Sequence, residues 1–207
     1  MTQPFPVARP GQRIGLFGGS FDPAHEGHVR LTEEALRSFG LDRVWWLVTP
    51  GNPLKSRQPA AMSHRIKQAR ALLSDPRVVV TGIEERLGTR LTADTIAALQ
   101  RHYPGVRFTW LMGSDNLVQF SEWERWQDIA QRVPIGVIAR PGSRLRARRS
   151  RAAQILARYR LREEQSQLLG AARPPAWVMV NMPLSNASST AIRAAKAAHA
   201  DSARRAP

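Results

Sequence analysis

Short apolar runs alternate with amphipathic stretches along most of the chain. The apolar runs predict six strands, at residues 13–17, 44–49, 78–81, 108–112, 135–139 and 177–180. Apolar residues at helical spacing predict helices between them, at residues 24–39, 62–73, 92–102, 122–132, 149–169 and 190–198. Alternating strands and helices, with strands that are apolar throughout, indicate an α/β fold. We expect a doubly wound, mostly parallel sheet with helices on both faces.

The length of the chain suits one domain with a sizeable core, since 207 residues lie within the usual range. We place this domain at residues 13–198. Residues 1–12 hold three prolines and lack the apolar stretch that a secretory signal needs, so we expect a flexible N-terminal extension. Residues 199–207 are expected to form a disordered tail.

Composition narrows the class of protein. The sequence has no run of about 18 apolar residues, so neither a transmembrane helix nor a membrane partner is expected. It has no cysteine, which excludes a disulfide framework and a thiolate metal site, and we expect a cytoplasmic location. The formal net charge of +15 is large and attracts anions such as nucleotides, pyrophosphate and nucleic acid.

The positive charge is concentrated in one stretch. Residues 140–162 hold nine arginines and no acidic residue. Two interpretations stay open: a solvated helix face, or a surface that steers phosphates or contacts nucleic acid. Tyr159 is the only aromatic residue in this stretch, which argues against a platform for stacking single-stranded bases.

The glycine-rich segment after the first predicted strand carries the most specific chemistry. Residues 18–28 read Gly-Gly-Ser-Phe-Asp-Pro-Ala-His-Glu-Gly-His. Two glycines let the backbone approach a ligand, and a helix that begins near Ala24 points free N–H groups and its positive dipole end at the loop. His25 and His28 are three residues apart, so they share one face of that helix. Together these features suit a polyphosphate such as a nucleoside triphosphate.

A second hydroxyl-rich segment precedes the last predicted helix. Ser188, Ser189 and Thr190 are followed by Arg193. An ordinary helix N-cap also uses a serine or threonine at such a position. Three hydroxyls and a guanidinium on one first turn would in addition make a second phosphate clamp.

These segments resemble motifs of a known superfamily. The first resembles the signature of the nucleotidyltransferases of the His-x-Gly-His type and matches it at every fixed position, with Ser20 as the hydroxyl residue. The second resembles the Ile-Ser-Ser-Thr-x-(Ile/Val)-Arg motif that partners it, with Ala187 in place of isoleucine. Residues 84–95, 108–123 and 140–142 resemble segments of the bacterial nicotinate-mononucleotide adenylyltransferases, although Arg90 and Leu91 replace the usual Ser-Tyr pair.

The resemblance spans residues 13 to about 195. It implies a Rossmann-like fold and a step of NAD biosynthesis, in which ATP and nicotinate mononucleotide give deamido-NAD and pyrophosphate. Mg²⁺ would be carried on the ATP, with no metal site in the protein. The residues implied for catalysis are His25, His28 and Arg193. Those implied for ATP binding are Gly18, Gly19, Ser20, Phe21, Lys55, Gly113, Asp115, Ser188, Ser189 and Thr190. Those implied for nicotinate-mononucleotide binding are Asn52, Thr92 and Trp123.

Three other interpretations stay open. Two keep the reaction type: an adenylyltransferase for nicotinamide mononucleotide, or one for phosphopantetheine, whose members share both phosphate motifs but are typically shorter. The third is a nucleic-acid-binding protein on the same fold, which the charge favours but which leaves both phosphate motifs unexplained. The main interpretation requires no nucleic acid, and it leaves the formation of a homo-oligomer open.

Overall fold

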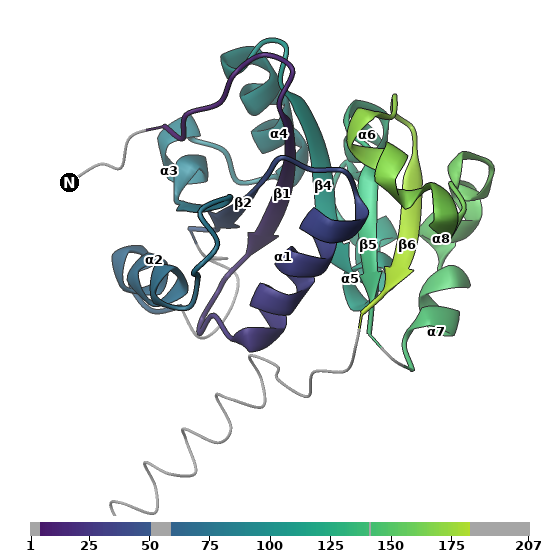
Figure 1. Cartoon of the computed structure of the whole chain (residues 1–207), viewed down its shortest axis with the longest axis horizontal. Helices are drawn as coiled ribbons and strands as arrows, with labels where there is room; N and C mark the ends of the chain where they lie inside the picture. Colours follow the sequence, from purple (N-terminus) through teal and green to yellow (C-terminus); the bar gives the residue numbers. More distant parts are fainter. Residues whose placement is uncertain (1–4, 51–58, 141, 183–207) are drawn as a thin grey trace, which may run out of the picture.

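The computed structural model describes residues 5–50, 59–140 and 142–182. Within these residues, strands form one sheet in the order β3-β2-β1-β4-β5-β6, and every pairing is parallel (Figure 1). The strands are β1 (Arg13–Gly19), β2 (Arg43–Val48), β3 (Val78–Thr81), β4 (Arg107–Gly113), β5 (Ile135–Ala139) and β6 (Trp177–Asn181). The expected parallel sheet is confirmed.

Helices cover both faces of the sheet, as expected (Figure 1). One face packs against α1 (Glu26–Ser38), α2 (Met62–Ala71) and the 3-10 segment η3 (Glu163–Ala171). The other face carries α3 (Ile83–Leu87), α4 (Thr92–His102), α5 (Ser114–Gln119), α6 (Trp126–Arg132), α7 (Arg144–Arg148) and α8 (Arg151–Ile155). Two short 3-10 turns are η1 (Phe120–Glu122) and η2 (Ala157–Tyr159). The core therefore consists of two apolar layers, one on each side of the sheet.

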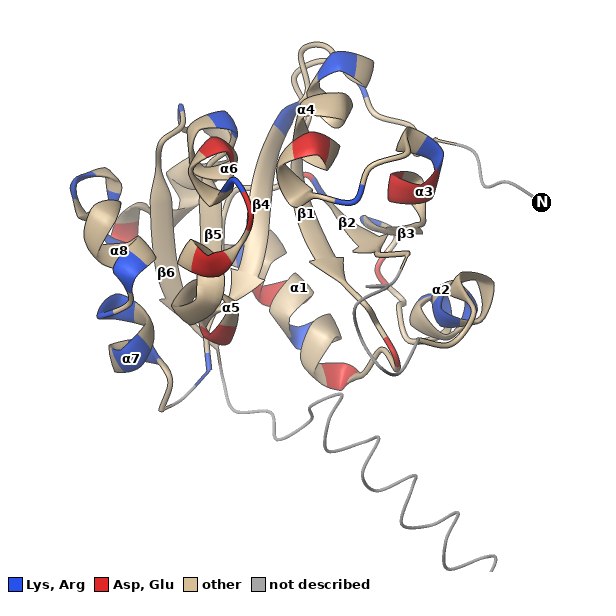
Figure 2. Ribbon diagram, turned by 180° about the vertical axis from the view of Figure 1, so that it is seen from behind, with Lys and Arg blue, Asp and Glu red and all other residues tan. Residues whose placement is uncertain are grey.

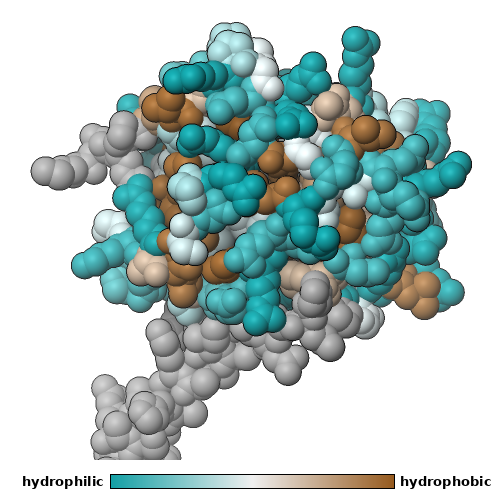
Figure 3. All heavy atoms as spheres, viewed as in Figure 1, coloured by the Kyte–Doolittle hydropathy of each residue, from teal (hydrophilic) through white to brown (hydrophobic). Residues whose placement is uncertain are grey.

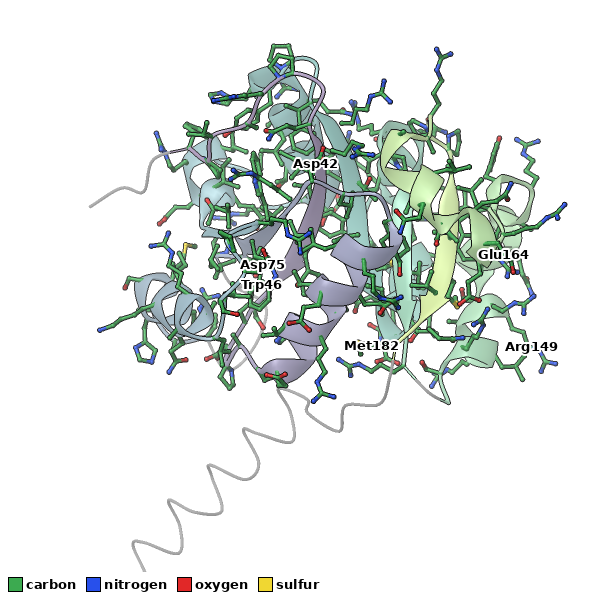
Figure 4. The ribbon with its side chains drawn as sticks, in the orientation of Figure 1. Asp42, Trp46, Asp75, Arg149, Glu164 and Met182 are labelled. Carbon is green, nitrogen blue, oxygen red and sulfur yellow. The ribbon has the colours of Figure 1, made fainter. Side chains whose placement is uncertain are left out.

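The paired tryptophans of β2 join these two layers. Both are completely buried, and because successive strand residues point to opposite faces, Trp45 enters the layer under α4 and Trp46 the layer under α1. The indole Nε1 of Trp46, which Figure 4 labels, donates a hydrogen bond to Thr32 Oγ1 of α1 at 2.7 Å. The apolar run of this strand thus fixes helices to both faces.

The topology places a switch point beside β1. The chain moves outward from β1 to β2 and β3, and then returns to the other side of β1 for β4, β5 and β6. Parallel strands end at the same edge of a sheet, so the residues that follow Gly19 of β1 and Gly113 of β4 lie at one edge. Ligands of open α/β sheets bind at this kind of crevice.

Residues 5–12 pack against the body of the domain. The ring of Phe5 stacks on His102 with 4.2 Å between centroids, and Tyr103 Oη donates to the carbonyl oxygen of Pro6 at 2.7 Å. The Gly11 N–H donates to the carbonyl of Gly105 at 2.8 Å. The flexibility of this segment and the boundary at residue 12 stay predictions. The predicted tail, 199–207, lies outside the described residues.

The helix predicted at residues 122–132 begins later than expected. Residues 120–122 form the turn η1, Trp123 is extended, and α6 begins only at Trp126. Arg125 separates the two segments because its backbone lies in the left-handed region, with φ of +56°, which no right-handed helix accommodates. The prediction also omitted α3, α5 and α7, which are too short to show a helical period.

The single basic helix predicted at residues 149–169 is wrong. The structure forms α8, η2 and η3 there, and Ser150 starts α8 by accepting a hydrogen bond from the Ala153 N–H at 3.4 Å. The chain then becomes extended, and the Leu161 N–H donates to the carbonyl of Trp177 in β6 at 2.8 Å. The arginines therefore do not form one helix face. Figure 2 shows the basic residues of α7 and α8 next to β6.

The described residues contain no helix long and apolar enough to cross a membrane. The face that carries α1 is largely hydrophilic, with apolar residues scattered between the polar ones (Figure 3).

Candidate functional site

The glycine-rich segment occupies the carboxyl end of β1. The strand ends at Gly19, residues 20–25 form a loop, and α1 begins at Glu26. The glycines there are required by packing as well as by access. A Cβ on Gly18 would lie 2.7 Å from Cη2 of Trp110, and one on Gly19 would lie 3.3 Å from the ring of Phe21. Because these two positions have no side chain, the rings of Trp110 and Phe21 can pack directly against the backbone of the loop.

Phe21 anchors this loop in the core. Its ring is 1% exposed and stacks on Trp46, with 4.7 Å between centroids and 6° between planes. Its backbone has φ of +46°, a left-handed conformation that is uncommon for a residue with a side chain. The aromatic contact compensates for this strain. Because the side chain points inward, a contact of Phe21 with ATP would have to come from its backbone.

His25 and His28 lie together at the start of α1, as their spacing predicts. Their rings stack with 3.8 Å between centroids. His25 is the N-cap, and its Nδ1 accepts a hydrogen bond from the Gly27 N–H at 3.1 Å. The Nδ1 of His28 accepts one from the His25 N–H at 3.2 Å. The His28 N–H donates to the carbonyl of His25 at 2.9 Å, so the helix start offers fewer free N–H groups than expected.

These hydrogen bonds determine which nitrogen of each ring can donate a hydrogen bond to a ligand. A nitrogen that accepts a hydrogen bond carries no hydrogen, so each neutral imidazole carries its hydrogen on Nε2. Burial and the positive charge of Arg140 lower the pKa of His25. Burial, His25 and Arg140 lower the pKa of His28 to about 3. Both rings are therefore neutral at physiological pH, and each presents an N–H donor.

Arg140 joins this site although the sequence analysis did not place it there. It follows β5 directly, at the same edge of the sheet, and its charge acts on both histidines. Its backbone is held on two sides, since its N–H donates to Ser114 Oγ at 3.3 Å and its carbonyl accepts from Ser143 Oγ at 2.7 Å. Its match to an Arg-Pro-Gly motif after a strand was the signal that could have identified it.

Gly113 and Asp115 lie where the sequence places them. Gly113 ends β4, and Asp115 is in the first turn of α5, with its side chain 63% exposed. One carboxylate oxygen of Asp115 lies 3.7 Å from Nη1 of Arg140. The switch point therefore combines the two neutral imidazoles with one cation and one accessible carboxylate.

Trp123 and Thr92 belong to neighbouring segments on the far face of the sheet. Trp123 is half-buried and meets Trp110 edge-on, with 6.2 Å between centroids. Thr92 is the first residue of α4. Two residues after Trp123, the Arg125 guanidinium forms an ion pair of 2.5 Å with Asp94 in the first turn of α4. This ion pair connects the tryptophan segment to the start of α4.

Glu84 is buried behind the first turn of α4. It is 4% exposed, and Thr95 Oγ1 lies 3.2 Å from its Oε1. The Thr95 hydroxyl is also 2.8 Å from that of Thr89. Burial raises the pKa of Glu84 to about 7. Glu84, Thr89 and Thr95, which belong to the family-like segment 84–95, therefore form a hydrogen-bond network that supports α4.

The other candidate residues lie outside the described residues. These are Asn52, Lys55, Ser188, Ser189, Thr190 and Arg193. Ser20 is described and is exposed at the loop. The described residues contain no group of three histidine, aspartate or glutamate side chains that could hold a metal ion.

Comparisons with known proteins agree with this arrangement. A family model described as cytidylyltransferase-like matches residues 16–195. A protein of Ruegeria pomeroyi is 62% identical over 94% of this chain and 92% of its own length. One of Roseobacter denitrificans is 58% identical over 93% of this chain and 97% of its own. Both are named probable nicotinate-nucleotide adenylyltransferase.

A solved structure shares the fold. Plasmodium falciparum nicotinic acid mononucleotide adenylyltransferase, complexed with NaAD, matches with a TM-score of 0.68. The match covers 88% of this chain and 83% of that chain at 17% sequence identity. At this identity the likeness supports the fold alone.

Proposed function

Since the chain belongs to the nicotinate-nucleotide adenylyltransferase family, within the cytidylyltransferase-like proteins, we propose that it transfers the adenylyl group of ATP to nicotinate mononucleotide. The products are nicotinate adenine dinucleotide and pyrophosphate, in a step of NAD biosynthesis. The observation that carries the proposal is the pair of imidazoles, each with its hydrogen on Nε2, at the switch point beside Arg140.

The reaction needs no nucleophile from the protein. A phosphate oxygen of nicotinate mononucleotide forms a bond to the α-phosphorus of ATP. The bond from that phosphorus to the oxygen bridging the β-phosphate breaks, and pyrophosphate leaves with the electron pair. The attacking oxygen is already anionic, so catalysis consists of positioning and charge stabilisation.

The residues at the switch point are suited to those two tasks. The Nε2–H groups of His25 and His28 donate to phosphate oxygens, with His28 nearest the α-phosphate. The fixed cation of Arg140 stabilises negative charge that develops on the phosphates. We assign the same role to Lys55 and Arg193, with the hydroxyls of residues 188–190 holding phosphate oxygens. We assign to Asp115 a contact with a ribose hydroxyl.

Mg²⁺ enters this reaction as part of the substrate. The described side chains at the switch point include two imidazoles, serine hydroxyls, the Arg140 guanidinium and the Asp115 carboxylate, a set that suits phosphate oxygens better than a resident metal ion. Mg²⁺ prefers oxygen ligands and usually reaches a site on substrate phosphates with only one or two carboxylates. We therefore propose that the triphosphate carries the ion.

The start of α4 and the Trp123 ring fit the mononucleotide. A nicotinate carboxylate is an anion, and the N-terminus of α4 offers backbone N–H groups and the positive end of a dipole. The nearby negative charge of Asp94 is offset by Arg125. Trp123 gives a flat face for the pyridine ring, and Asn52 is assigned to the same substrate. This arrangement favours the acid over the amide. The cytoplasmic location stays a prediction.

The test is pyrophosphate release from MgATP, run in parallel with nicotinate mononucleotide, nicotinamide mononucleotide and phosphopantetheine. We expect strong turnover with the first alone. Faster turnover with either of the others would replace the proposed substrate. No turnover with any acceptor, together with salt-dependent binding of RNA, would favour the nucleic-acid-binding interpretation instead.

A pair of histidine variants tests the roles within the site. His28→Ala should lower kcat about 100-fold or more, because one donor to the reacting phosphate is lost. His64→Ala is the matched control, since His64 is exposed on α2, and it should keep the native rate. Thermal unfolding of each variant shows whether it is folded. A folded His28→Ala protein with a near-native rate would contradict the assignment.

A further inference from the structure

Arg65 is a buried cation directly beneath the phosphate-binding loop. It lies on α2, and only 1% of its surface is exposed. No carboxylate forms an ion pair with it among the described residues, although Asp22 attracts it electrostatically. Burying an arginine is costly unless its donors are satisfied, so its contacts must explain its position.

Three of the five N–H groups of the guanidinium donate to carbonyl oxygens. Nη1 donates to the carbonyl of Ser20 at 2.6 Å and to that of Thr49 at 3.0 Å, and Nε donates to the carbonyl of Ala60 at 2.7 Å. These oxygens belong to three separate segments: the loop after β1, the residue after β2, and the chain just before α2. One side chain therefore joins three backbone segments beside the switch point.

The bond to Ser20 fixes the direction of a peptide group. In a planar trans peptide, the C=O and the N–H point in opposite directions. The carbonyl of Ser20 points inward to Arg65, so the N–H of the same peptide, which belongs to Phe21, points away from it. Among the described residues this N–H donates no hydrogen bond. It is a donor held in a fixed direction within the loop assigned to ATP.

We propose that Arg65 is a positioning residue for the adenylyl transfer, which sets the Ser20–Phe21 peptide so that its N–H donates to the triphosphate of ATP. The inference rests on the proposed function, because it takes this loop to bind the triphosphate. The guanidinium also places a fixed positive charge behind the loop. Its effect should be larger on ATP than on the mononucleotide, since one of its hydrogen bonds holds the loop assigned to ATP and none reaches the Thr92 or Trp123 segments.

Three variants separate this role from a purely structural one. Arg65→Gln removes the charge and most donors, and Arg65→Lys keeps the charge but not the planar set of donors. Arg70→Gln is the matched control, because Arg70 lies on the same helix and donates to the carbonyl of Val80 in β3 at 3.1 Å, away from the loop. Each purified protein is first checked by thermal unfolding.

The first measurement is equilibrium binding of MgATP by calorimetry, without any acceptor. We expect at least about tenfold weaker binding for Arg65→Gln, an intermediate loss for Arg65→Lys and the native affinity for Arg70→Gln. Native affinity in both Arg65 variants would overturn the inference. If Arg65→Gln does not fold, Arg65→Lys decides the matter alone, since native affinity there would also overturn it.

Steady-state kinetics give the second measurement. The KM for MgATP should rise by a larger factor in Arg65→Lys than the KM for nicotinate mononucleotide, whereas a general loss of folding would move both values equally or neither. The two proposals can fail separately. A wild-type protein that binds MgATP but does not use nicotinate mononucleotide contradicts the proposed reaction and leaves the role of Arg65 measurable by binding. A wild-type protein that does not bind MgATP overturns both.

Discussion

Glu84 should make the folding stability of this protein decrease as the pH rises. Its carboxyl group is 4% exposed, and its hydrogen-bond partner there is the hydroxyl of Thr95, 3.2 Å away. A single neutral donor does not replace the water that an ionised carboxylate loses on burial. Burial therefore raises the pKa of Glu84 from 4.5 to about 7.

The direction of the effect follows from proton binding. Between pH 4.5 and about pH 7, the folded protein keeps the proton on Glu84 while the unfolded chain has released it. The folded state then binds more protons, so the free energy of unfolding falls as the pH rises. The stability that Glu84 contributes is fully present below pH 4.5, its pKa in the unfolded chain. It is lost as the pH rises through about 7, its pKa in the folded protein. A shift of this size corresponds to about 3 kcal/mol.

Glu84→Gln isolates this contribution because glutamine keeps the shape but does not titrate. Urea unfolding of wild type and variant is measured from about pH 4.5 to about pH 7.5, and the difference in unfolding free energy is plotted. We expect the difference to move by about 3 kcal/mol in favour of the variant as the pH rises. Glu85→Gln removes an exposed carboxyl from the same helix and is the control. A Glu84→Gln difference as flat as that of the control would refute the reasoning.

Two further variants test the site and the corrected helix. Arg140→Gln removes a positive charge that acts on both histidines. The pKa values of His25 and His28 should therefore rise in an NMR titration. Unchanged pKa values would show that Arg140 lies too far from the two rings to affect them. Ser150→Ala removes the side-chain cap of α8, so it should lower the unfolding free energy by about 1 kcal/mol. An unchanged free energy in urea unfolding would contradict the start of a separate helix at Ser150.

The strands could be predicted because the sheet is covered on both faces. A strand buried on two sides is apolar at every position, and such runs stand out between polar turns. The bounds predicted for β3 and β5 match those of the structure. The basic helix failed for the opposite reason. Alanine and arginine favour a helix at each position, but pairing of Leu161 with Trp177 at the edge of the sheet overrides that local preference.

Some residues of the candidate site are brought together by local helix geometry, and others only by contacts between distant parts of the chain. His25 and His28 were predictable together because they are three positions apart at a helix start, and helix geometry alone brings the rings into contact. Arg140 reaches them only through the order of the strands, and Arg65 only through hydrogen bonds to three separate segments. In the sequence, Arg65 is indistinguishable from the other basic residues of α2.

The histidine pair shows why folding and chemistry are inseparable at this site. The helix start uses Nδ1 of each ring to satisfy a backbone N–H, and the same hydrogen bonds leave the hydrogen of each ring on Nε2. A pKa of about 3 keeps His28 neutral, so this donor does not require an acidic solution to exist. Binding a polyphosphate would add negative charge beside rings whose pKa is lowered by burial and Arg140. The rings would meet this charge as neutral Nε2–H donors, because protonation would add a second hydrogen to each ring, on Nδ1, and break the hydrogen bonds that Nδ1 accepts from the helix start.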